Sequence, residues 1–432
     1  MDKSINKTIC AIPFVGMEVG NNQNFRFCCI ARGPGADLTK DGKLLRPGVD
    51  LIADAWNNDE LKETRRKMLA GEQVEACRVC YYRESIGKTS NRQHSLNEWS
   101  WLLGKDQLDA LFERAKNNEY VVDVPPVYLD LRLGSICNLK CRMCNPWNST
   151  QIAKEHFELY DNNEGYRTLW HKKAGNNPIY LKEKNEWYES NVLWDEIISM
   201  IPSLRKVYMT GGEPTLVEGN FKFMEKVIEL GYQDKIILFF NMNCTNVNKR
   251  FLELIRKFKT VKINASLDGV GAANDYIRYP SKWPQVAENF ERLAQEPNVE
   301  LRVSPCLTVY NALESEKIFY YIDEVRKKYN RSIGMDYLMN SGLDSLNSTI
   351  LPFDVRQEAL TRVLQLGKNV DLMREPGVQD SFNGLVGILS SPQDANAGQL
   401  IDEFKVYTEA LDASRDQRLA EVFPEVYKAL YE

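Results

Sequence analysis

The stretch Ile136-Cys137-Asn138-Leu139-Lys140-Cys141-Arg142-Met143-Cys144-Asn145-Pro146 stands directly after a short β-rich run at residues 128–133. Its three thiolates can hold three irons of a four-iron cluster, which leaves the fourth iron open to another ligand. An open iron indicates chemistry rather than a structural role. A structural zinc site is the alternative, but such sites normally close with a fourth Cys or His nearby. The next histidine, His156, lies twelve residues downstream.

Short β-rich runs alternate with amphipathic helical stretches from residue 126 to residue 340, which is the pattern of parallel βα units. The expected strands are 128–133, 206–210, 235–244, 261–268, 299–311 and 333–340, and the expected helices are 221–230, 247–258, 285–295 and 313–329. Six such units predict an α/β fold, a partial (β/α)6 TIM-like barrel whose site lies at the C-terminal strand ends. Polar residues at every second strand position, such as Asp130 and Arg132, predict a polar lumen. An open sheet with one face in water is the alternative.

The second expected strand ends in Thr210-Gly211-Gly212-Glu213-Pro214. Adjacent glycines allow positive φ and a close approach of the backbone to a ligand. A carboxylate beside exposed carbonyl groups suits an ammonium group. Taken alone, this motif is more often a turn before a helix.

The three-cysteine loop followed one βα unit later by Gly-Gly-Glu resembles the radical S-adenosylmethionine (radical SAM) enzymes. The resemblance implies a [4Fe-4S] cluster on Cys137, Cys141 and Cys144 whose open iron binds S-adenosylmethionine. Reductive cleavage would then give methionine and a 5′-deoxyadenosyl radical that abstracts a hydrogen atom from the substrate. Further cofactor contacts implied by position are Gly211, Gly212 and Glu213 for the methionyl amine, Ser266 for the ribose, Arg278 for the carboxylate and Asn311 on the adenosine side.

A second group of cysteines lies near the N-terminus: Cys10, Cys28, Cys29, Cys77 and Cys80. Four thiolates from separate points of a small fold can close a complete cluster or a zinc site. The arrangement resembles the twitch module, a short SPASM-like auxiliary-cluster domain, although that module usually follows the barrel. The resemblance implies a second [4Fe-4S] cluster on Cys10, Cys28, Cys77 and Cys80, with Cys29 as a packing thiol. A zinc ribbon is the alternative.

The composition is that of an ordinary globular protein, with 43% hydrophobic and 27% charged residues. No apolar run is long enough for a membrane span, and the N-terminus has no secretory layout. Ten cysteines without a secretion signal favour metal ligation over disulfides. We therefore expect a cytoplasmic protein. The formal net charge of −5 argues against a broad nucleic-acid-binding surface.

The predicted organisation is a cysteine-rich module at 1–95, a helical linker at 96–125, the barrel at 126–340 with an insertion at 147–203, and a helical extension at 341–432. Within that extension, 375–398 is expected to be irregular. Cys306, on the fifth expected strand, is a candidate hydrogen-atom donor to a substrate radical, and a buried packing thiol is the alternative.

The expected function is that of a radical SAM enzyme acting on a peptide or a polar small molecule. The auxiliary cluster would assist electron transfer, and an external donor such as a flavodoxin or ferredoxin would supply electrons. A non-catalytic iron–sulfur or zinc scaffold or electron carrier, and a tRNA-modifying radical SAM enzyme, are the alternatives.

Overall fold

The computed structural model describes residues 7–85, 89–174, 187–339 and 343–432. The chain forms two compact units. Unit 1 comprises residues 1–134, 185–240 and 253–260, and unit 2 comprises 135–184, 241–252 and 261–432. The predicted domain boundary at 340–341, and residues 175–186 of the predicted insertion, lie outside the described residues.

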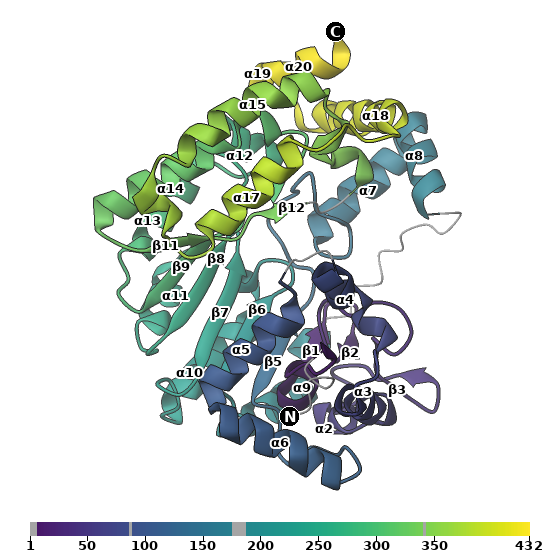
Figure 1. Cartoon of the computed structure of the whole chain (residues 1–432), viewed down its shortest axis with the longest axis vertical. Helices are drawn as coiled ribbons and strands as arrows, with labels where there is room; N and C mark the ends of the chain where they lie inside the picture. Colours follow the sequence, from purple (N-terminus) through teal and green to yellow (C-terminus); the bar gives the residue numbers. More distant parts are fainter. Residues whose placement is uncertain (1–6, 86–88, 175–186, 340–342) are drawn as a thin grey trace. The chain divides into compact units, whose positions relative to one another are not determined.

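The fold is α/β, with a mostly parallel sheet in the strand order β11-β9-β8-β7-β6-β5-β1-β2 (Figure 1). The strands are β1 (Gly16–Gly20), β2 (Asn24–Arg26), β5 (Tyr128–Arg132), β6 (Lys206–Thr210), β7 (Ile237–Met242), β8 (Val261–Ala265), β9 (Val299–Val303) and β11 (Ile333–Met335). The six predicted strands are adjacent in chain order, as successive βα units require. This arrangement is consistent with a partial TIM-like barrel and confirms the predicted fold class.

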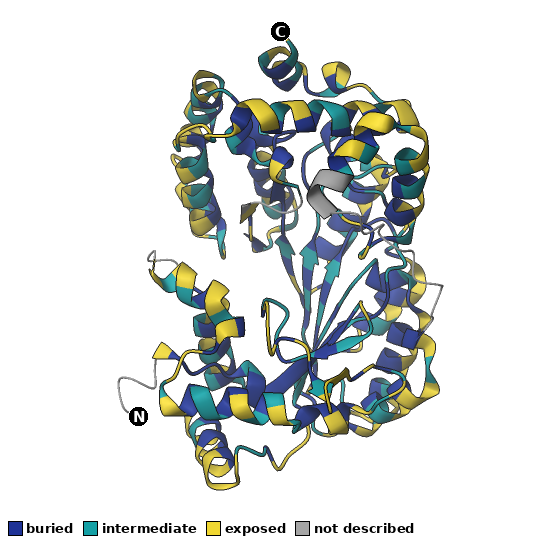
Figure 2. Ribbon diagram, turned by 90° about the vertical axis from the view of Figure 1, so that its right-hand side faces the viewer, coloured by how far each residue is buried: buried dark blue, intermediate teal, exposed yellow. Residues whose placement is uncertain are grey.

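The alternation of side chains along β8 follows the prediction. Val261, Ile263 and Ala265 are fully buried, whereas Lys262 and Asn264 are half-buried. Figure 2 shows the same contrast more widely: the strands are mostly buried or intermediate, and the helices carry exposed residues along one side. Period-two burial of this kind is what fixes the register of a strand against its neighbours.

The N-terminal segment contributes two strands that the sequence did not predict. β1 pairs in parallel with β5, with Glu18 opposite Asp130, and β2 pairs with β1 in an antiparallel hairpin. Gly16 permits the pairing, because a Cβ there would lie 2.3 Å from the carbonyl oxygen of Tyr128. The cysteine-bearing segment is therefore attached to the first barrel strand.

Helices surround these strands in each unit. Unit 1 contains α1 (Ile12–Val15), α2 (Ile52–Trp56), α3 (Asp59–Ala70), α4 (Arg78–Ser85), α5 (Asn91–Leu103), α6 (Lys105–Asn117), α9 (Asn191–Ser199) and α10 (Glu218–Glu229), and a two-stranded ribbon of β3 (Thr39–Lys40) and β4 (Lys43–Leu44). Unit 2 contains α7 (Thr150–Asn162), α8 (Glu164–Ala174), α12 (Ala272–Ile277), α13 (Trp283–Ala294), α14 (Glu316–Tyr329), α15 (Phe353–Leu366), α16 (Val370–Met373), α17 (Val378–Leu389), α18 (Ala397–Arg415), α19 (Leu419–Val422) and α20 (Pro424–Tyr431). Helix α11 (Lys249–Ile255) has residues in both units.

Three sequence predictions are wrong in detail. The sixth expected strand, 333–340, is interrupted, because β11 ends at Met335 and a separate strand begins at Leu338. The fifth strand is not continuous over 299–311, because β9 ends at Val303 and a separate strand, β10 (Cys306–Leu307), pairs with β12 (Leu338–Met339). Pro305 stands at the break and has no N–H with which to continue the ladder. The segment 375–398 is not irregular, since it contains the twelve-residue helix α17.

None of the helices in the described ranges has the length and apolar character needed to cross a bilayer.

Candidate functional site

The three-cysteine loop, residues 137–144, follows β5 and is hydrogen-bonded to a second segment of unit 2. The N–H of Lys140 donates to the carbonyl of Tyr279 at 2.6 Å, and the N–H of Arg142 donates to the carbonyl of Ile277 at 2.8 Å. These bonds hold the middle of the loop against the end of α12. The loop itself turns back at its last thiol, where the N–H of Cys144 donates to the carbonyl of Cys141 at 3.0 Å.

Arg142 is the deepest anchor of this loop. Its side chain is fully buried and lies 3.6 Å from the ring centroid of Tyr276. The guanidinium forms an ion pair with Asp412 on α18 and donates to Gln417 at 3.1 Å. Tyr407, also on α18, donates its hydroxyl to the carbonyl of Arg142 at 2.8 Å. A helix far along the sequence therefore fixes the residue that separates two of the thiols.

Two polar networks hold the rest of the loop. Asn138 donates to the hydroxyl of Thr245 at 2.8 Å and accepts from Asn243 at 3.0 Å, and both partners follow β7. Lys140 pairs with Glu155 at 2.9 Å, which in turn pairs with Arg415 of α18 at 2.6 Å. Buried ionic networks favour one arrangement because partial disruption leaves a charge unpaired.

The thiols of the loop lie in a desolvated setting. Burial raises the pKa of Cys141, and burial followed by the proximity of Cys141 raises the pKa of Cys144 to about 12. The N–H of Leu139 donates to the sulfur of Cys137 at 3.5 Å, and Arg278 donates to the sulfur of Cys141 at 3.8 Å. Donors to sulfur stabilise thiolates and cluster sulfurs. Metal binding would displace the thiol protons.

Across the described residues, no three His, Cys, Asp or Glu side chains are arranged to hold a metal ion.

Asp268, just beyond β8, joins three of the predicted site residues. Its carboxylate pairs with Arg278 at 2.6 Å and accepts from the N–H of Cys306 at 2.7 Å. Asn311 donates to the carbonyls of Asp268 and Cys306 at 2.8 and 2.9 Å. Asn311 and Cys306 are buried. Asn311 and Cys306 therefore both contribute hydrogen bonds that hold this part of the fold. Arg278 bridges the carboxylate of Asp268 and the sulfur of Cys141.

Ser266 lies in the same stretch after β8. It is half-buried, and its N–H donates to the carbonyl of Met242 at 2.8 Å. Arg278 is likewise of intermediate exposure, whereas Asn311 is buried.

The Gly-Gly-Glu turn lies in unit 1, at the end of β6. Gly211 has φ of 119°, and a Cβ there would lie 3.0 Å from the carbonyl oxygen of Gly134. The glycine is thus required by a close approach to the backbone that follows β5. The buried carboxylate of Glu213 accepts from the N–H and hydroxyl of Thr215 at 3.3 and 2.7 Å, which caps the short turn Pro214–Leu216.

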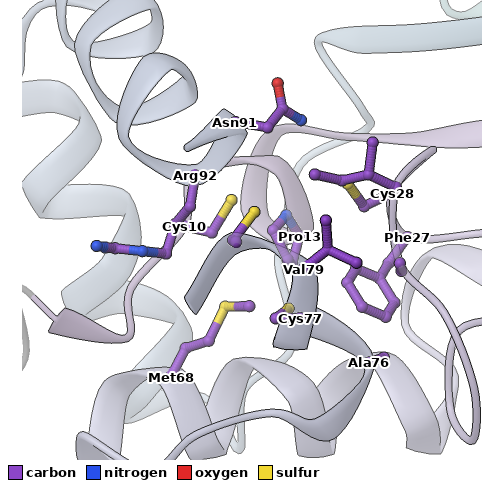
Figure 3. Close-up of a pocket in the computed structure, with 13 residues that line it drawn as sticks. Cys10, Pro13, Phe27, Cys28, Met68, Ala76, Cys77, Val79, Asn91 and Arg92 are labelled. Atoms are coloured by element: carbon purple, nitrogen blue, oxygen red, sulfur yellow. The ribbon is translucent and has the colours of Figure 1, made fainter. Parts of the chain in front are cut away.

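The four predicted N-terminal ligands line one cavity in unit 1 (Figure 3). It is enclosed by Cys10, Pro13, Phe27, Cys28, Ile30, Ala31, Met68, Ala76, Cys77, Val79, Cys80, Asn91 and Arg92. Burial raises the pKa of Cys10 to about 12 and raises the pKa of Cys77 and Cys80 as well. The guanidinium of Arg92 adds a cation near these thiols. Four sulfurs with a nearby cation suit an anionic cluster or zinc centre.

Cys29 is not among the residues that line this cavity. It interacts with Asp130 and Arg132 of β5, and a hydrogen bond to Cys28 together with burial raises its pKa well above the usual range. Of the two adjacent cysteines, Cys28 is thus the one that lines the cavity.

Glu18 and Asp130 form a buried carboxylate pair next to Cys29 that the sequence analysis missed. The two residues are opposite each other on β1 and β5, and Arg132 lies 3.2 Å from both carboxylates. Arg26 also pairs with Glu18, at 3.4 Å. Burial and the charge of Asp130 raise the pKa of Glu18 to about 7. The parallel pairing that creates this contact had no signal in the sequence.

The raised pKa makes stability depend on pH. Below about pH 4.5 Glu18 is protonated in the folded and unfolded chain alike, so it carries no penalty. Between about pH 4.5 and 7 only the unfolded chain loses the proton readily, so the free energy of unfolding falls as pH rises, by an amount on the order of 3 kcal/mol. Glu18→Gln is expected to remove this fall. The Tm of the variant minus that of the wild type should be larger at pH 8 than at pH 5.

Glu113→Gln is the matched control, because Glu113 is exposed on α6. Its Tm difference from the wild type should be the same at both pH values. A Glu18→Gln difference that is also the same at pH 5 and pH 8 would contradict the raised pKa.

Residues 131–303 match the Radical SAM superfamily. This part of the chain is a radical SAM domain, the type of domain found in a superfamily of enzymes. The matched region includes the three-cysteine loop, the Gly-Gly-Glu turn, Ser266 and Arg278. Cys306 and Asn311 lie beyond it.

Similar solved structures have low sequence identity to this chain, and the chain spans less than two thirds of the length of the first of them. Native anSMEcpe with bound AdoMet is 17% identical, and the similarity covers 58% of this chain and 62% of that chain with a TM-score of 0.39. SuiB from Streptococcus suis, bound to the precursor peptide SuiA, is 12% identical, with 68% and 60% covered and a TM-score of 0.34. TYW1 with a lysine-pyruvate adduct is 14% identical, with 55% and 70% covered and a TM-score of 0.28. No curated protein matches the chain.

Proposed function

We propose that the chain binds a [4Fe-4S] cluster through Cys137, Cys141 and Cys144 and uses S-adenosylmethionine to abstract a hydrogen atom from a peptide or a polar small molecule. The observation that carries this proposal is the three-thiol loop, anchored through its backbone and Arg142, within a region that matches the Radical SAM superfamily. When bound, the cluster would supply the electron that cleaves the sulfonium and yields the deoxyadenosyl radical.

The residues around the loop have distinct roles in this proposal. Arg278 keeps a positive charge next to the sulfur of Cys141 and is itself held by Asp268. Gly211, Gly212 and Glu213 are assigned to the methionyl amine, Ser266 to the ribose and Asn311 to the adenosine side. Because Asn311 already donates to two carbonyls, its role is to shape the end of strand β8 as well as to contact the cofactor.

The proposal is tested by incubating the reconstituted protein, reduced with dithionite under anaerobic conditions, with S-adenosylmethionine. Release of 5′-deoxyadenosine, detected by liquid chromatography, is the expected result. Cluster-loaded protein that releases none would instead support a non-catalytic scaffold or electron carrier. Substrate classes would then be separated by tracing deuterium from labelled peptides or metabolites into deoxyadenosine, and salt-dependent binding of tRNA would favour the nucleic-acid alternative.

We further propose that the N-terminal cavity holds a second [4Fe-4S] cluster on Cys10, Cys28, Cys77 and Cys80, as in a twitch-like module. Four protein thiolates leave no open iron, so this cluster would transfer electrons and not bind S-adenosylmethionine. The cytoplasm is the compartment we propose, because it keeps such thiols reduced and available to metal. An external donor such as a flavodoxin or ferredoxin would supply the electrons.

Cys28 and Cys29 give a matched pair of variants for this second cluster. Cys28→Ala is expected to lower the iron content from about eight to about four per chain, because it removes a ligand, whereas Cys29→Ala should retain about eight. Iron and sulfide analysis of anaerobically reconstituted protein provides the measurement. If Cys29→Ala loses the iron and Cys28→Ala keeps it, the ligand assignment is wrong. Zinc in place of iron would contradict the proposal that this cavity holds a second iron–sulfur cluster.

Cys306 is the proposed hydrogen-atom donor to a substrate radical. Cys306→Ala is expected to leave release of 5′-deoxyadenosine intact but to lower the yield of quenched product, because the thiol acts after hydrogen abstraction. Deoxyadenosine and product are measured in the same reaction. An unchanged ratio would return Cys306 to the packing role that its burial also suits.

A further inference from the structure

The exposed face of α4 lies directly over the cavity proposed for the second cluster. Val79 lines that cavity and is also 36% exposed. Tyr82, one turn further along the same helix, is 66% exposed. Residues three and four apart on a helix are neighbours on its surface. The exposed Arg78 lies four residues before Tyr82, and the exposed Arg83 lies four residues after Val79, so each extends this surface.

Arg32 extends this surface from the loop that carries Cys28. Its N–H donates to the carbonyl of Ala76 at 3.0 Å, which ties the loop to the start of α4. A Cβ at Gly33 would lie 3.8 Å from a guanidinium nitrogen of Arg78, so the side chain of Arg78 reaches this loop. We call the surface formed by Arg32, Arg78, Val79, Tyr82 and Arg83 the α4 face.

The charge of the α4 face differs from that of the whole chain. It contains three exposed arginines beside Val79 and Tyr82, although the chain has a formal net charge of −5. The guanidinium of Arg32 also donates to the carbonyls of Ala31 and Cys29 at 2.8 and 2.9 Å, which holds this charge at the loop. Of the neighbouring carboxylates in the described sequence, Glu75 is exposed, and Glu84 is paired with Arg92 at 2.7 Å. Complementary charge steers association and sets the on-rate of weak complexes.

We propose that the α4 face is the docking site for an acidic one-electron carrier protein that exchanges electrons with the N-terminal cluster. This inference rests on the proposed second cluster. A small apolar centre with a cationic rim suits transient redox encounters, which bury little surface, better than a stable dimer. Val79 is a wall of the cavity and part of the surface at once, so a carrier seated there would come close to the thiolates.

When a flavodoxin reduces the N-terminal cluster, the hydroquinone anion of the flavodoxin gives up one electron and becomes the neutral semiquinone. The cluster accepts that electron and goes from the 2+ to the 1+ state. No proton or further reactant is needed. The same surface would serve the reverse transfer to an oxidised carrier.

The test uses stopped-flow reduction of the cluster by an acidic flavodoxin in its hydroquinone state. It is carried out on the holoenzyme and on a Cys137→Ala/Cys141→Ala/Cys144→Ala variant. This variant lacks the ligands of the loop cluster, so its signal comes from the N-terminal cluster. The wild-type rate should fall as salt rises. Arg78→Glu/Arg83→Glu should slow reduction about tenfold or more at low ionic strength and lose the salt dependence. Tyr82→Ala should slow it at all salt concentrations.

Arg114→Glu is the matched control, because Arg114 is 52% exposed on α6 and lies outside the α4 face. It should leave the rate unchanged, and dithionite should reduce all variants alike. An unchanged flavodoxin rate in the Arg78/Arg83 variant, with the cluster present, overturns the docking site alone. A variant that instead loses substrate turnover with dithionite as reductant shows that the face serves the substrate, which also overturns it. Absence of iron from the N-terminal cavity overturns the proposed second cluster itself.

Discussion

Replacing Cys141 with alanine is expected to abolish reductive cleavage of S-adenosylmethionine. The thiol is the buried central member of the loop and lies beside Arg278. Loss of residues that merely orient metal ligands typically costs roughly 10–100-fold in affinity or activity, so loss of a ligand itself should cost more. The release of 5′-deoxyadenosine by reduced protein gives the measurement, and iron analysis should show the loss of about four irons per chain.

Cys244→Ala provides the matched control for thiol removal. Cys244 is fully buried in the same unit, follows β7 and is outside the proposed ligand set. Its replacement should leave both the iron content and deoxyadenosine release close to wild type. If Cys141→Ala keeps its activity, or if both variants lose it equally, the loop is not the site of the open iron.

Arg142→Met is expected to have the largest effect on stability. The substitution removes the buried guanidinium that pairs with Asp412. The carboxylate of Asp412 keeps the hydrogen bond from the hydroxyl of Tyr276, at 2.7 Å, but loses this cationic partner. Breaking a buried ion pair from one side typically costs about 3–5 kcal/mol. In a unit of this size each kcal/mol moves Tm by about 2–4 °C. The Tm of the protein without metal should therefore fall clearly.

The loop should also lose its cluster in this variant, because Arg142 separates Cys141 from Cys144. Asp412→Asn should have a smaller effect of the same kind, and the double variant should cost less than the sum of the two single changes. Arg418→Met is the matched control, since Arg418 is 76% exposed and pairs with Glu421 on the surface. Its free energy of unfolding should change by no more than about 0.5 kcal/mol, so its Tm should stay close to that of the wild type. Equal Tm values for Arg142→Met and Arg418→Met would contradict the anchoring role.

Much of the barrel could be predicted from the sequence, because its strands carry their own signal. In β6 the predicted and observed bounds are identical, and the alternation in β8 follows the expected parity. These features depend on local spacing of apolar residues. The loop motif was equally local, since its three cysteines fall within eight consecutive residues.

The parts that were missed depend on contacts between distant residues. The pairing of β1 with β5 creates the Glu18 and Asp130 contact across more than one hundred residues of sequence. The contact between Arg142 and Asp412 joins the cluster loop to α18 in the same way. Neither leaves a periodic pattern in the chain. By contrast, the break at Pro305 had a signal, because a proline inside a predicted central strand argues against continuity.

The most direct test of the central claim is the electron paramagnetic resonance spectrum of the dithionite-reduced protein with and without S-adenosylmethionine. If one cluster has an iron without a protein ligand, the cofactor should change the g-values of its signal, and this change should disappear in Cys141→Ala. A reduced spectrum that is identical with and without the cofactor would contradict the proposed open iron and the radical chemistry assigned to it.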